Sequence, residues 1–69
     1  MKIQEEARRI FQNLEDAGYP WLVGTYLDRD EDGQFLVIET KHLGQSGQVV
    51  GQTTPHGHRV KHIYRPSSS

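Results

Sequence analysis

The chain has 69 residues, and a domain of this size buries only about 60% of the surface that its unfolded chain exposes, which excludes a large enzyme. Its net charge is −1, and the absence of cysteine excludes a disulfide framework and a thiolate zinc site. No apolar run approaches the roughly 18 residues of a membrane span, and no signal-like apolar segment follows Met1. We therefore expect a cytoplasmic protein with no membrane partner and no cofactor, with one domain over residues 1–66 and a disordered tail at 67–69.

The first element expected is an amphipathic helix that ends near Ala17. Polar side chains, Glu6 among them, are expected on the side of the helix opposite to its apolar stripe. Gly18 suits the left-handed position just past a helix end, and Pro20 cannot continue the hydrogen-bond ladder. The apolar stripe repeats at intervals of three and four and consists of Ile3, Ala7, Ile10, Phe11, Leu14 and Ala17.

Two runs rich in β-branched and aromatic residues, 21–27 and 35–40, flank a turn-forming segment and predict a β-hairpin. If Asp30 to Gly33 close the turn, Leu27 faces Leu36 and Thr25 faces Ile38. One face of the hairpin, which the helix is expected to cover, then carries Trp21, Val23, Thr25, Leu27, Leu36 and Ile38. The other face carries Leu22, Tyr26, Phe35 and Val37.

Two further short runs, 48–53 and 58–64, follow turn signals and are interpreted as a third and a fourth strand. The predicted fold class is α+β, with one N-terminal helix packed on a mainly antiparallel sheet of about four strands in the order α-β-β-β-β.

The apolar second face of the hairpin suggests a binding surface, because one helix cannot cover both faces of a sheet. The sequence therefore predicts a small non-enzymatic binding or adaptor protein. Its partner would be a second copy of the chain or a larger protein, bound through Leu22, Tyr26, Phe35 and Val37. The alternative is that these residues are scattered exposed apolar side chains without a function.

Charge is segregated along the chain, with −5 over residues 1–39 and +4 over residues 40–69. On an extended strand Arg59, Lys61 and Arg65 share one face, and with Lys41 they form a candidate site for an anion or a nucleic acid. A nucleic-acid-binding protein is the second functional hypothesis. Two alternatives need no ligand: the basic strand neutralises the acidic half, or it protects an exposed sheet edge.

The residue types in the turn segment also match a calcium-binding sequence pattern. Asp28, Asp30, Asp32 and Gly33, with Glu39 in the twelfth place, satisfy D-x-D-x-D-G-x5-E. An EF-hand needs a helix on each side, however, and the flanks here are predicted strands, which carry Glu39 away from the aspartates. We expect an acidic, solvated turn that does not hold calcium at sensor affinity, and the three aspartates are weak metal candidates only.

The last group of candidate functional residues consists of histidines. His56 and His58 are weak candidates for a metal, whereas His58 and His62 would lie about 13 Å apart along a strand, too far for one ion. The third functional hypothesis is a small histidine-dependent ribonuclease or a metal-binding protein, in which imidazoles act as acid and base or as ligands. No catalytic residue is assigned from the sequence.

Overall fold

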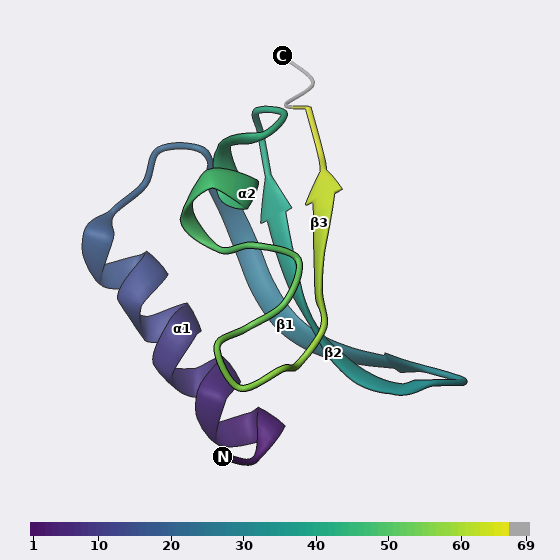
Figure 1. The fold of residues 1–69 in the computed structure, drawn as a ribbon. Coiled ribbons are helices and arrows are strands. Elements are labelled where there is room, and N and C mark those ends of the chain that lie inside the picture. The colour runs from purple at the N-terminus through teal and green to yellow at the C-terminus, as the bar shows by residue number, and fades with distance from the viewer. Residues whose placement is uncertain (67–69) are drawn as a thin grey trace.

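Two helices and three strands make up the part of the chain that the computed structural model describes, residues 1–66. In chain order they are α1 (Ile3–Ala17), β1 (Leu22–Asp30), β2 (Gly33–Thr40), α2 (Gln45–Val49) and β3 (Val60–Tyr64). The helices lie against one face of the sheet (Figure 1). The α+β class is therefore confirmed, whereas the predicted tail at 67–69 lies outside the described residues.

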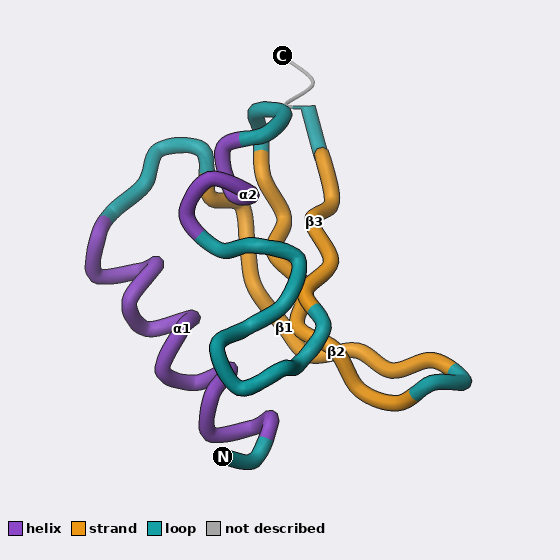
Figure 2. Tube along the Cα trace, viewed as in Figure 1, coloured by secondary structure: helices purple, strands orange, loops and turns teal. Residues whose placement is uncertain are grey.

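The sheet has three strands and is mixed, so the prediction of four mainly antiparallel strands is wrong. β2 lies in the centre, antiparallel to β1 and parallel to β3. Parallel neighbours require a crossover connection of a dozen residues or more. Residues 41–59 form it, as α2 followed by a loop (Figure 2), and they include the run 48–53 that was predicted to be a strand.

The predicted helix is confirmed at its C-terminal end. α1 ends at Ala17, and Gly18 has φ 66°, a left-handed conformation that suits glycine, with its N–H donating to the carbonyl of Glu15 at 3.1 Å. Ala7 and Leu14 on the apolar stripe are buried against the sheet. The prediction for Glu6 was wrong, because the pattern placed this residue on the polar side of the helix and the structure buries it.

The hairpin has the predicted register, with Leu27 opposite Leu36 and Thr25 opposite Ile38. Asp30 pairs with Gly33, and the Asp30 carboxylate accepts a hydrogen bond from the Asp32 N–H at 2.9 Å, which stabilises the turn between the strands. The end of the hairpin projects beyond the helices (Figure 1).

An irregularity near the start of β1 corrects two face assignments. The register shifts between Leu22, which pairs with Thr40, and Gly24, which pairs with Glu39, so Val23 is an extra residue of a β-bulge. Leu22 consequently packs against the core under α1, whereas Val23 is 47% exposed. Strict alternation had assigned them to the opposite faces.

The core lies between the sheet and the helical layer. Leu36 and Ile38 of the central strand are completely buried, and Val60 of β3 lies beside Leu36. Ala7, Leu14 and Trp21 complete this buried cluster. Among residues 1–66, no helix has the length and the apolar character that crossing a membrane requires.

Candidate functional site

The sheet face turned away from α1 and α2, here called the outer face, carries most of the residues that the sequence selected. Because Leu27, Leu36 and Val60 point into the core, the neighbouring positions point outward. One row across the strands is Tyr26, Val37 and Lys61. Three of the four predicted interface residues therefore lie on the outer face, while Leu22 lies on the opposite one.

The apolar centre of the outer face is covered by basic side chains of the same chain. Val37 is 1% exposed and Phe35 is 8% exposed. The Arg59 guanidinium carbon lies 5.1 Å from the centre of the Phe35 ring, and Lys61 Nζ lies 5.9 Å from it, both in cation–π contact. Tyr26 remains accessible, with 39% of its surface exposed.

Two of the four basic residues singled out from the sequence are in ion pairs. Arg59 donates to both carboxylate oxygens of Asp30, at 2.8 and 3.1 Å, and to the Gly33 carbonyl at 3.1 Å. Its guanidinium holds the pKa of Asp30 below the usual value for an aspartate. Arg65 pairs with Glu39. Intramolecular neutralisation thus accounts for part of the basic stripe.

Charge on the outer face is sorted from one edge of the sheet to the other. Asp28 and Asp30 belong to β1, one edge strand, and Lys61 belongs to β3, the other edge strand, which Arg59 and Arg65 flank. Phe35 and Val37 of the central strand lie between these edges, Glu39 follows them on the same strand, and Tyr26 lies on β1 itself. The outer face therefore carries acidic side chains on β1 and basic side chains on and around β3, with Asp30 and Glu39 already paired to Arg59 and Arg65 within the chain.

The aspartates of the calcium-like pattern do not meet Glu39. Glu39 pairs with Gly24, four residues from Asp28 along β1, and Asp30 is engaged by Arg59. Within the described residues, 1–66, no group of three or more acidic or histidine side chains is arranged to hold a metal ion.

The histidines predicted as metal candidates lie around a buried carboxylate that the sequence did not reveal. Glu6 is 3% exposed, and it accepts hydrogen bonds from the Thr54 hydroxyl and from the His56 N–H, the latter at 3.2 Å. The Nε2 atoms of His56 and His58 lie 4.0 and 3.9 Å from its oxygens. His58 Nε2 also lies 3.1 Å from the Met1 carbonyl oxygen. This cluster fastens the crossover to the start of α1.

The Glu6 carboxylate makes folding sensitive to acid. Burial raises its pKa, but the hydrogen bonds from Thr54 and His56 and the nearby imidazoles of His56 and His58 outweigh burial, so the pKa lies below its ordinary value of 4.5. A carboxyl group whose pKa is lower in the folded state stabilises the fold fully above its unfolded pKa. That contribution is lost as the pH falls through the lower, folded pKa.

We therefore expect Glu6→Gln to lower the melting temperature near pH 7, and we expect the difference from the unmodified protein to shrink as the pH falls below about 4.5. Thermal unfolding followed by circular dichroism between pH 7 and pH 3 measures this difference. Glu5→Gln is the matched control, because Glu5 is exposed on the same helix, and it should leave the melting curves unchanged. A gap of equal size at both ends of the pH range would contradict the assignment to Glu6.

A serine and a histidine that the sequence analysis did not connect meet between α2 and β3. Ser46 Oγ lies 2.7 Å from His62 Nδ1, and His62 Nε2 lies 3.0 Å from the carbonyl oxygen of Gly51. The sequence signal was only a serine in a glycine-rich turn, because its partner lies sixteen positions away along the chain.

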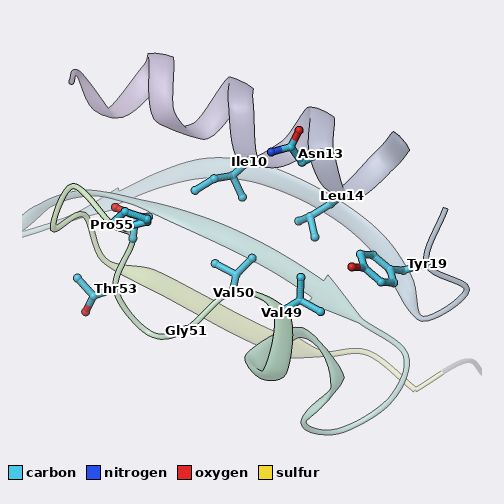
Figure 3. Close-up of a pocket in the computed structure, with 10 residues that line it drawn as sticks. Ile10, Asn13, Leu14, Tyr19, Val49, Val50, Gly51, Thr53 and Pro55 are labelled. Carbon is cyan, nitrogen blue, oxygen red and sulfur yellow. The ribbon is translucent and has the colours of Figure 1, made fainter. Parts of the chain in front are cut away.

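An apolar groove separates α1 from the segment that follows α2 (Figure 3). It encloses about 460 Å³, within the range of small-molecule pockets, and its lining carries no charged side chain. An uncharged ligand would suit it better than an ion. The lining includes Ile10, Asn13, Leu14, Tyr19, Val49, Val50, Thr53 and Pro55.

Fold and site together define a two-layer α+β protein. One face of its sheet is not covered by helices and carries acidic side chains on β1 and basic side chains at β3. The chain matches no protein-family model, no curated protein and no solved structure. Its function is therefore argued from geometry and chemistry alone.

Proposed function

We propose that this protein is a small non-enzymatic binding module that associates with a second copy of itself through the outer face of its sheet. The observation that supports this proposal is the distribution of charge on that face, with Asp28 and Asp30 on β1, Lys61 on β3, and Phe35 and Val37 of β2 between them. Such a surface is complementary to itself, and self-complementary surfaces form two-fold dimers.

The symmetry of the dimer follows from the strand order. A two-fold axis in the interface plane, parallel to β2, places β1 of each protomer over β3 of its partner. Asp28 then lies opposite the partner's Arg59 and two positions along β1 from the residue opposite the partner's Lys61, and the same contacts are made a second time by symmetry. In the row Tyr26, Val37 and Lys61, Val37 of the central strand then lies opposite its own copy and Tyr26 lies opposite the partner's Lys61, at the roughly 10 Å spacing of packed sheets.

The size of the chain limits the area that a dimer can bury. Its Cα trace measures 37 × 27 × 17 Å. A standard interface takes about 800 Å² from each partner, roughly one sixth of the 4804 Å² of the chain. Because basic side chains already cover Phe35, we expect micromolar rather than nanomolar affinity.

Mass in solution tests the proposal directly. Sedimentation equilibrium over a concentration series should show a monomer–dimer equilibrium with a Kd of about 1–100 μM. Amide chemical shifts measured over the same series should change along Tyr26, Val37 and Lys61 and stay constant on α1. A protein that remains monomeric throughout the series, or shifts confined to the helical layer, would overturn the proposal.

A nucleic-acid partner remains the alternative hypothesis for the basic strand. Arg59 and Arg65 are already paired with acidic side chains, which leaves Lys61 and Lys41 for phosphate contacts. Binding of single-stranded DNA measured across a salt series separates the two functions. Affinity that falls steeply with salt, with no dimer present, would favour the nucleic-acid hypothesis over self-association.

A further inference from the structure

We infer that Ser46 is an activated hydroxyl, with His62 as its general base, and that it accepts short neutral acyl groups from activated esters. This inference is independent of self-association, because Ser46 lies in the helical layer and not on the outer face. It rests on a hydrogen-bonded chain of three groups that come from α2, from β3 and from the connection between them.

The direction of the two hydrogen bonds follows from the Gly51 carbonyl, the last of the three hydrogen-bonded groups. The Gly51 carbonyl oxygen can only accept, so His62 Nε2 carries the hydrogen in the 3.0 Å contact. In a neutral imidazole the other nitrogen then has a free lone pair, and Nδ1 accepts from the Ser46 hydroxyl at 2.7 Å. A nucleophile bonded to a base, with the base oriented by a third group, is the arrangement of activated serines in general.

The position of the pair in the fold suits a ligand site. Ser46 and His62 both line a cavity of about 270 Å³, together with Thr40 and Tyr64, the last residues of the parallel strands β2 and β3. Crevices outside the carboxyl ends of parallel strands are where open sheets with helical connections bind ligands. Leu43 at the same cavity is 75% exposed, which gives the cavity an apolar rim.

Access and size restrict the acyl group. Ser46 itself is 1% exposed, so only a group that enters the cavity reaches its hydroxyl. Gly47, the next residue, also lines the cavity and has no side chain to fill it. The cavity is small, and His62 is the one titratable group in its walls apart from the Tyr64 phenol, so a small uncharged acyl group such as acetyl is the expected substrate.

The reaction is an acyl transfer in which atoms and charges balance. Ser46 Oγ attacks the carbonyl carbon of an aryl ester while its proton passes to His62 Nδ1, and the aryl oxide leaves as its bond to carbon breaks. The proton on Nδ1 then passes to the aryl oxide or to water, and Ser46 is left acylated. No dedicated donor for the oxyanion is assigned, and such a donor typically contributes about 10²–10³-fold, so we expect slow acylation rather than efficient turnover.

The test is acetylation by p-nitrophenyl acetate, with the modified residue located by peptide mass spectrometry. We expect acetylation at Ser46, lost in Ser46→Ala and slowed about a hundredfold or more in His62→Gln, the usual contribution of a general base. His58→Gln is the matched control and should leave the rate unchanged. Ser67, Ser68 and Ser69 serve as reference hydroxyls in the same chain.

The effect of each substitution on folding must be distinguished from its effect on reactivity, because the hydrogen bond between Ser46 and His62 also connects α2 to β3. Ser46→Cys keeps a nucleophile of similar size and should be acylated faster than the serine, with a thermal unfolding curve close to that of the unmodified protein. Acetylation confined to lysines or to the terminal serines would overturn the inference. An unchanged rate at Ser46 in folded His62→Gln would also overturn it.

Discussion

Replacing Ile38 by alanine is expected to bring this protein close to unfolding. Ile38 is completely buried in the central strand, where it contacts the helical layer. Removing a buried isoleucine to alanine costs about 2–5 kcal/mol, through lost burial and the cavity that remains. A chain of this size has a total stability of only about 3–10 kcal/mol, by the usual range per residue. Thermal unfolding should therefore show a melting temperature lower by about 10–30 °C.

Val23→Ala is the matched control for this substitution. Val23 is also a β-branched apolar residue of the first hairpin, and simple alternation assigns it to the same buried face as Ile38. The bulge at the start of β1 instead leaves it 47% exposed, so its replacement should cost no more than about 0.5 kcal/mol. Equal losses at the two positions would show that the bulge is absent and that strict alternation holds through β1.

Reversing one charge on the outer face is expected to dissociate the proposed dimer, and reversing a second charge is expected to restore it. In Lys61→Glu an acidic side chain lies opposite β1 of the partner, one row from Asp28, twice per dimer. Juxtaposed like charges at an interface cost enough for the Kd to rise at least about tenfold, equivalent to about 1.4 kcal/mol. In the double variant Lys61→Glu with Asp28→Lys, attraction returns with the signs exchanged, and the Kd should return towards its original value.

The double variant excludes a purely structural explanation. Within one protomer, Asp28 and Lys61 lie in different rows of the two edge strands, and the acidic residue that pairs across the sheet is Asp30, with Arg59. Arg8→Glu makes a comparable change of charge at an exposed position of α1 and should leave the Kd unchanged. Loss of the dimer in both the single and the double variant, or in Arg8→Glu, would contradict the proposed symmetry.

Local signals in the sequence were sufficient to place the first helix and the hairpin, but not the bulge at Val23 or the burial of Glu6. The glycine after the last residue of α1 and the turn at Asp30–Gly33 each act over a few positions, and both were predicted correctly, whereas Ala17 of the predicted apolar stripe is exposed. The segment around Val49 and Val50 was not predicted correctly. Its β-branched residues favour a strand, yet it forms part of the crossover, because β3 pairs with β2 in the parallel direction and a parallel partner cannot follow a tight turn.

In the candidate sites, too, local patterns were predicted and contacts between distant segments were missed. Alternation placed Tyr26, Phe35 and Val37 on one face, and it also placed Arg59, Lys61 and Arg65 together. Alternation could not show that Arg59 and Lys61 cover Phe35, because this contact joins residues far apart in the chain. Glu6 with Thr54, and Ser46 with His62, were missed for the same reason.

The parallel pairing of β2 and β3 has a consequence for how the chain folds. Every residue pair between these strands is separated by 24 positions, as Leu36 and Val60 are, whereas Asp30 and Gly33 in the hairpin are only three apart. Closing the longer loop costs more conformational entropy before any contact compensates for it. The hairpin can therefore form early as a local nucleus, and docking of β3 becomes the slower event that completes the core around Val60.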